Sequence, residues 1–179
     1  MTQCMTMAED KTERRFSAAV LTLSDKGAAG EREDRSGAVV REMLEAAGIR
    51  VDRTEILPDD RALVEERLRQ LASSGLDLVV TTGGTGVSPR DVTPEATLAV
   101  IDREIPGMSE AMRAESLKVT PHAMISRAVC GLAGRTLIVN LPGSPKGARE
   151  CLSVVMPALP HALDVTAGAV TECAAEEVD

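Results

Sequence analysis

Leu76 to Pro94 read LDLVVTTGGTGVSPRDVTP, and this stretch decides the architecture. It begins with an apolar run and continues into a loop with three glycines in four positions. Thr93 and Pro94 then predict a helix with Thr93 as its N-cap and Pro94 as its first residue. Glycines leave backbone N–H groups uncovered, and a helix N-terminus attracts anions. The stretch predicts a strand, a phosphate-binding loop and a helix, with an ordinary glycine-rich turn as the alternative.

Other apolar runs predict further strands over 18–23 and 136–140, with a weaker one over 49–57. Their continuous apolar character is typical of strands buried on both faces of a parallel sheet. A short strand over 127–130 and a turn over 131–134 are also expected. Helical patterns lie between the strands, including 93–102 and 109–118. This alternation predicts an α/β fold, a three-layer sandwich with a mostly parallel sheet and helices on both faces.

The length of 179 residues fits one domain, which we place at 16–171. A flexible N-terminal segment is expected at 1–15 and an acidic C-terminal tail at 172–179. The opening segment has no apolar run typical of a signal peptide, and no run in the chain is long enough to cross a bilayer. A cytoplasmic location is therefore expected.

The composition argues against a nucleic-acid or membrane partner. The formal net charge is -8, and Phe16 is the single aromatic residue, so a basic face and base-stacking platforms are both missing. The cysteines are far apart and are expected to be reduced thiols or buried small residues: Cys4, Cys130, Cys151 and Cys173. His122 and His161 are expected to be structural, although His122 could line a cleft.

Candidate binding residues gather on four loops. The loops after parallel strands meet at the carboxyl edge of a sheet, and ligands bind there. These loops are Ser24-Asp25, Pro58-Asp59, the glycine loop and 140–146. The candidates for substrate or nucleotide binding are Ser24, Asp25, Thr82, Gly83, Gly84, Thr85, Gly86, Arg90, Pro142, Gly143, Ser144 and Lys146.

Two carboxylates on this edge, Asp59 and Asp91, are the candidate catalytic and metal-binding residues. Paired carboxylates beside a phosphate site can hold Mg²⁺, which neutralises a polyphosphate. Asp59 could instead cap the next helix, although Asp60 is the better cap. Lys146 opposes a helix dipole, which a bound anion would offset, and a solvated lysine is the alternative.

These motifs, with 23–25 and 34–37, resemble the MogA/MoaB family of molybdenum cofactor biosynthesis, to which the G domains of gephyrin and Cnx are related. The resemblance implies a molybdopterin adenylyltransferase, in which the terminal phosphate of molybdopterin attacks the α-phosphate of Mg·ATP and pyrophosphate leaves. Asp59 and Asp91 match the family's two essential aspartates, which serve the metal and the reacting phosphates. The resemblance also implies a homotrimer, or a homohexamer in the MoaB branch.

Two other functions stay open. The part from Cys151 onward is compact, as in gephyrin and MoaB, so the branch is undecided and a non-catalytic pterin-binding carrier is an alternative. Hydrolysis of a nucleotide pyrophosphate is the other. An ordinary P-loop ATPase and a dinucleotide enzyme are excluded, because neither G-x-x-x-x-G-K-[ST] nor a helix-opening G-x-G-x-x-G occurs.

Overall fold

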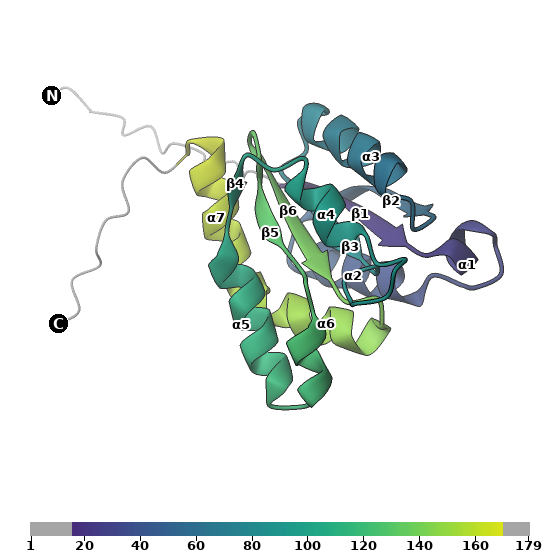
Figure 1. The fold of residues 1–179 in the computed structure, drawn as a ribbon. Coiled ribbons are helices and arrows are strands. Elements are labelled where there is room, and N and C mark those ends of the chain that lie inside the picture. The colour runs from purple at the N-terminus through teal and green to yellow at the C-terminus, as the bar shows by residue number, and fades with distance from the viewer. Residues whose placement is uncertain (1–15, 170–179) are drawn as a thin grey trace, which may run out of the picture.

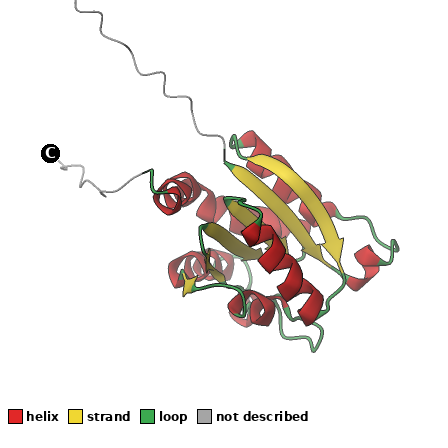
Figure 2. Cartoon of the chain, turned by 90° about the horizontal axis from the view of Figure 1, so that it is seen from above, coloured by secondary structure: helices red, strands yellow, loops and turns green. Residues whose placement is uncertain are grey.

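The computed structural model describes residues 16–169. A sheet lies at the centre, with helices on both of its faces (Figures 1 and 2). The three-layer α/β fold predicted from the sequence is thereby confirmed. The segments predicted at 1–15 and 172–179 lie outside the described residues, and the domain boundaries remain predictions.

The order of the elements follows the predicted alternation. Along the chain they are β1 Ser17–Leu23, α1 Asp25–Ala28, α2 Arg35–Ala46, β2 Arg50–Leu57, α3 Arg61–Ser73, β3 Leu78–Thr82, α4 Thr93–Leu98, β4 Arg103–Glu104, α5 Pro106–Leu117, η1 Pro121–Ile125, β5 Cys130–Ala133, β6 Thr136–Leu141, α6 Pro145–Val155, η2 Met156–Ala158 and α7 Leu159–Ala167.

Within the described part of the chain the sheet has six strands in the order β2-β1-β3-β6-β5-β4. Strands β2, β1, β3 and β6 are parallel, whereas β5 is antiparallel to β6 and β4 is antiparallel to β5. The parallel strands therefore end at one edge, as the sequence predicted. No helix within residues 16–169 is both long and apolar enough to span a membrane.

Two apolar cores sandwich the sheet because successive strand side chains point to opposite faces. Ala18 and Val20 of β1 pack in the core that includes α2, α5, α6 and α7, and Ala19 and Leu21 pack in the core that includes α3 and α4. A strand buried on both faces needs an unbroken apolar run, which explains the sequence of β1, β3 and β6.

Two predicted helix caps are confirmed. The Asp60 carboxylate accepts from the Leu63 amide at 3.1 Å, and the Ser144 hydroxyl accepts from the Gly147 amide at 3.1 Å. Both side chains satisfy N–H groups that the first helical turn leaves unpaired. Asp59 is not the N-cap of α3, so its carboxylate is available for contacts at the carboxyl edge of the sheet.

The predicted cap at Thr93 was wrong. Val92 is the N-cap of α4, and the buried Thr93 hydroxyl donates to the Gly83 carbonyl at 2.8 Å. The helix predicted over 93–102 ends at Leu98, and residues 99–102 form a turn and a short connection to β4. Tertiary hydrogen bonds outweigh local capping preference here, because the glycine loop supplies a buried carbonyl that needs a donor.

The turn predicted over 131–134 was also wrong, because Cys130–Ala133 forms β5 and the chain turns at Gly134. Gly131 is needed in this strand by close packing, since a Cβ there would lie 2.6 Å from the Arg103 carbonyl oxygen. From sequence alone, a glycine that allows close approach of another backbone segment cannot be distinguished from a glycine in a turn.

Candidate functional site

The four loops converge on one cavity of about 830 Å³ at the carboxyl edge of the sheet. Each predicted loop contributes lining residues, and Asp59 and Asp91 both line the cavity. Residues 31–36, which cover the end of the connection from α1 and the start of α2, form another side. The predicted site residues on this lining are Ser24, Asp59, Thr82, Gly83, Gly84, Asp91, Gly143 and Ser144.

The glycine loop presents backbone N–H groups because α4 holds its carbonyls. The Gly83 carbonyl accepts from the Thr93 hydroxyl at 2.8 Å, and the Gly84 carbonyl accepts from the Thr93 amide at 3.2 Å. In a trans peptide the C=O and N–H point in opposite directions, so the amides of Gly84 and Thr85 turn away from Thr93. Neither amide has an acceptor within residues 16–169. Two such donors in sequence suit an anion.

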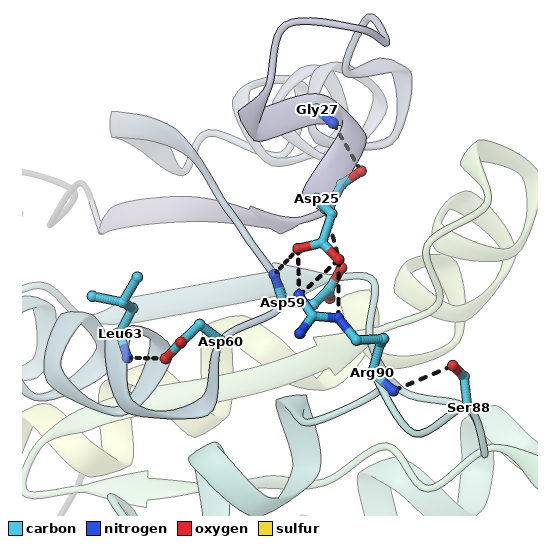
Figure 3. Close-up of polar contacts among 8 residues, drawn as sticks. Asp25, Gly27, Asp59, Asp60, Leu63, Ser88 and Arg90 are labelled. Atoms are coloured by element: carbon cyan, nitrogen blue, oxygen red, sulfur yellow. Dashed lines mark hydrogen bonds and ion pairs between the residues drawn. The ribbon is translucent and has the colours of Figure 1, made fainter.

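Asp59 is held by a reciprocal pair of hydrogen bonds with Asp25 (Figure 3). The Asp59 amide donates to the Asp25 carboxylate at 3.0 Å, and the Asp25 amide donates to the Asp59 carboxylate at 3.2 Å. Arg90 points at the same carboxylate of Asp25 and donates to it through Nε at 3.0 Å and Nη2 at 2.7 Å. This arrangement joins the loops after β1, β2 and β3.

The charges around Asp59 perturb two carboxyl groups in opposite directions. Burial raises the pKa of Asp59, as do the nearby carboxylates of Asp25 and Asp91, whereas the hydrogen bond from Asp25 and the charge of Arg90 lower it. The hydrogen bonds from Arg90 and Asp59 hold the pKa of Asp25 below its ordinary value. A carboxylate whose surroundings disfavour its charge gains from a cation, so Asp59 is suited to metal binding.

We expect Asp59→Asn to be slightly more stable than wild type at neutral pH. A carboxyl whose folded pKa is raised contributes stability below its unfolded value, here about 3.8, and loses it as pH rises through the folded value. Asparagine avoids that cost and can still accept from the Asp25 amide. Because Asp59 is partly exposed, the gain is below about 1 kcal/mol. Urea unfolding at neutral and acidic pH measures it, and a variant less stable at neutral pH would contradict the assignment.

Asp91 is held by its own loop. The Ser88 amide donates to Asp91 Oδ2 at 2.8 Å, and the Asp91 amide donates to the Ser88 carbonyl at 2.9 Å. A Cβ at Gly86 would lie 2.9 Å from Asp91 Oδ2, so glycine leaves room for the carboxylate. Within residues 16–169 there is no group of three or more His, Cys, Asp or Glu side chains arranged for a metal. Mg²⁺ fits nonetheless, because it usually takes one or two carboxylates and completes its shell with water and substrate phosphates.

A second cavity of about 280 Å³ adjoins the first. Ser144 lines both cavities, and Thr85, Gly86 and Pro142 line the second. Asn140, at the start of the predicted loop 140–146, also lines it. Sequence reasoning missed Ser116 and Ser126, because they lie on separate segments that no local pattern joins and that only the tertiary structure brings together. His122 also lines this cavity, as one of the two interpretations of that residue held.

Other contacts are made by four of the predicted binding residues: Arg90, Asp25, Thr82 and Lys146. Arg90 pairs with Asp25, and neither residue belongs to the lining of the first cavity. The Thr82 hydroxyl donates to the Pro142 carbonyl at 2.7 Å and so joins two loops. The Lys146 side chain is 77% exposed and lies 3.8 Å from Glu150, which favours the solvated alternative in this state.

Of the cysteines, Cys130 and Cys151 are buried free thiols, as predicted, while Cys4 and Cys173 lie outside the described residues. Burial raises the pKa of Cys130 to about 12 and also raises that of Cys151. Thiols that stay protonated are poor nucleophiles, so these residues serve packing.

The fold and the site define an α/β protein with a cavity at the carboxyl edge of a mainly parallel sheet. A family model described as "Probable molybdopterin binding domain" matches residues 19–161, and the chain belongs to this family. The resemblance predicted from the sequence is thus confirmed.

Named relatives agree with this membership. A "Molybdopterin adenylyltransferase" of Helicobacter pylori strain J99 is 44% identical over 152 residues, covering 83% of this chain and 86% of the relative. The protein of the same name from Escherichia coli K12 is 37% identical over 175 residues and 89% of each chain. Among solved structures, the molybdopterin biosynthesis enzyme MoaB from Thermus thermophilus is 51% identical with a TM-score of 0.81, covering 86% of this chain and 97% of that one.

Proposed function

We propose that this protein is a molybdopterin adenylyltransferase of molybdenum cofactor biosynthesis. A terminal phosphate oxygen of molybdopterin attacks the α-phosphorus of ATP, the bond from that phosphorus to the bridging oxygen breaks, and pyrophosphate leaves. The observation that carries the proposal is the convergence of Asp59, Asp91 and two glycine-containing loops on one cavity. The curated relatives with this name, which match most of the chain, support it.

The two adjoining cavities suit two substrates. We assign the triphosphate to the larger cavity, which Gly84, Asp59 and Asp91 line and where the Gly84 amide has no acceptor among the described residues. The smaller cavity has hydroxyl and amide groups beside Met112, which suits a flat polar ring such as a pterin. Ser144, on the wall shared by both, would lie near the reacting phosphates.

Asp59 and Asp91 are the residues that would hold Mg²⁺. When bound, this ion would neutralise the polyphosphate and the charge that develops on the leaving pyrophosphate. The chain itself orients Asp59 through the Asp25 amide and Asp91 through the Ser88 amide, so both carboxylates are placed before a ligand arrives. Preorganised groups of this kind need little rearrangement during the reaction.

Purified protein with molybdopterin, MgATP and pyrophosphatase is expected to accumulate adenylyl-molybdopterin. The pterin product is followed by chromatography and the released phosphate by a colorimetric assay. Tight molybdopterin binding without ATP consumption would replace this proposal by the carrier function. AMP release from a dinucleotide without pterin would replace it by pyrophosphate hydrolysis.

We also propose that the protein acts in the cytoplasm as a homotrimer or homohexamer, which the family resemblance implies. Sedimentation equilibrium of the purified full chain distinguishes these assemblies from a monomer. The proposed partners are molybdopterin and ATP, without nucleic acid or membrane.

A further inference from the structure

Arg127 lies outside all four loops, between η1 and β5, yet it contacts the glycine-loop segment and α4 at four points. Its Nε donates to the Gly86 carbonyl at 2.6 Å, and its Nη2 donates to the Asp91 carbonyl at 2.7 Å. Its backbone amide donates to the Thr85 carbonyl at 2.9 Å, and Nη1 forms an ion pair with Glu95 of α4. One guanidinium therefore bridges both ends of segment 86–91.

This bridge fixes the backbone that carries Asp91. Inside segment 86–91, the Ser88 amide already holds the Asp91 carboxylate, so the segment is a small closed loop with Arg127 across its base. Releasing either carbonyl would let the loop widen, and Asp91 would move relative to Asp59, which lines the same cavity. The spacing of the two carboxylates thus depends on a side chain that lines neither cavity.

The same contact orients a backbone donor. Because the Gly86 carbonyl is held by Arg127, the N–H of the same trans peptide, on Val87, points away from the guanidinium. Thr93 orients the preceding peptides in the same way through Gly83 and Gly84. Arg127 and Thr93 together hold carbonyls along the whole glycine loop.

Glu95 holds the guanidinium in this position. Hydrogen bonding and charge from Arg127 outweigh burial and keep the pKa of Glu95 below its ordinary value. Glu95 Oε1 accepts from Arg127, whereas the buried Oε2 has no hydrogen-bond partner within residues 16–169, so Arg127 is an important partner of this carboxylate. A planar guanidinium can reach two carbonyls and a carboxylate at fixed angles, whereas a lysine ammonium cannot.

We propose that Arg127, held by Glu95, is a positioning residue that sets the affinity of the site for the Mg²⁺-bound nucleotide by fixing Asp91 and the glycine loop. This inference rests on the proposed function for the identity of the nucleotide. Asp91 lines the first cavity and not the second, so the effect that acts through Asp91 depends on Mg²⁺. Arg127 also holds the carbonyls of Thr85 and Gly86, which line the second cavity, so a smaller loss that does not depend on Mg²⁺ is expected there.

The test compares Arg127→Lys with Arg135→Lys in the full chain. Arg135 is a matched control, because its Nη2 also donates to a distant backbone carbonyl, that of Ala167, at 2.6 Å, but on the opposite edge of the sheet. Calorimetry measures binding of a non-hydrolysable ATP analogue with saturating Mg²⁺ and with a chelator, and binding of molybdopterin separately. Removing an outer partner of a metal ligand typically weakens binding about 10- to 100-fold.

We expect Arg127→Lys to weaken Mg²⁺-dependent nucleotide binding by about tenfold or more and to raise the Mg²⁺ concentration for half-maximal binding. Chelator-treated nucleotide binding should change less than about twofold, molybdopterin binding should fall less than Mg²⁺-dependent nucleotide binding, and Arg135→Lys should match wild type. An unchanged Mg²⁺ dependence, or equal losses for both substrates, overturns the inference. Should Arg127→Lys fail to fold by circular dichroism, Glu95→Gln decides it, with a smaller shift expected in the same direction.

These binding measurements separate two failures. Wild-type protein that binds both substrates without forming adenylyl-molybdopterin contradicts the proposed function, and Arg127 is still judged by the Mg²⁺ dependence. Wild-type protein that transfers the adenylyl group, with unchanged Mg²⁺ dependence in the variants, contradicts only the role of Arg127.

Discussion

Asp91→Asn is expected to lower kcat/KM for adenylyl transfer by about 10²- to 10³-fold, because a lost carboxylate at a phosphate site costs several kcal/mol and each ~1.4 kcal/mol is tenfold. Asparagine has nearly the same shape, and its side-chain oxygen can still accept from the Ser88 amide. The loss of activity would therefore result from the missing negative charge, because the conformation of the loop that carries residue 91 is retained. Steady-state kinetics at several Mg²⁺ concentrations measures it.

Asp102→Asn is the control for this variant. Asp102 also accepts from one backbone amide, that of Gly134 at 2.6 Å, but it lies at the opposite edge of the sheet. We expect activity close to that of wild type. Turnover of Asp91→Asn within a factor of about three of wild type, a difference of less than about 1 kcal/mol, would remove Asp91 from the mechanism.

Gly84→Ala is expected to lower the free energy of unfolding by about 3 kcal/mol, of which backbone strain at positive φ accounts for ~1 kcal/mol and crowding for ~2 kcal/mol. Gly84 has φ +63, and a Cβ there would lie 2.4 Å from Thr93 Oγ1 and 3.1 Å from Asp59 Oδ1. Thr93 would have to release the Gly83 carbonyl. Displacement of catalytic groups by ~1 Å can cost about 10²-fold in rate, so activity falls as well.

Gly134→Ala separates strain from crowding. Gly134 has nearly the same φ, +58, and a Cβ added there would meet nothing within 4 Å. We expect a loss of about 1 kcal/mol from backbone strain alone, with activity unchanged. Urea unfolding and kinetics of both variants provide the comparison. Equal destabilisation of the two variants would show that the contact with Thr93 carries no cost.

The features of this protein that could be predicted from sequence are those determined by residues close together in the chain. The apolar runs of β1, β3 and β6 reveal strands buried on both faces, and Asp60 and Ser144 reveal helix starts. Because parallel strands end at one edge, the meeting of the loops that carry Asp59 and Asp91 also followed from the predicted topology. Pattern and topology were sufficient for these features.

Other features depend on contacts between distant segments. The Thr93 hydroxyl could cap its helix or hold the Gly83 carbonyl, and the choice depends on a carbonyl ten residues away. Gly131 has the sequence appearance of a turn but admits the Arg103 backbone. Arg90 has the character of a phosphate ligand, but the folded chain places Asp25 beside it. In each case the local sequence favours one role for the residue, and a contact with a residue distant in the chain gives it another.

By itself the sequence determined the layered α/β fold, the edge that carries the ligand-binding loops, and the family. Those features follow from apolar periodicity and from short motifs, which act over a few residues. Only the tertiary structure decided how the loops are held, through Arg127, Thr93 and the Asp25–Asp59 pair. Hydrogen bonds have strict distance and angle requirements. Whether a side chain and a backbone group 36 or 34 residues apart in the chain meet them is fixed by the packing of the whole fold.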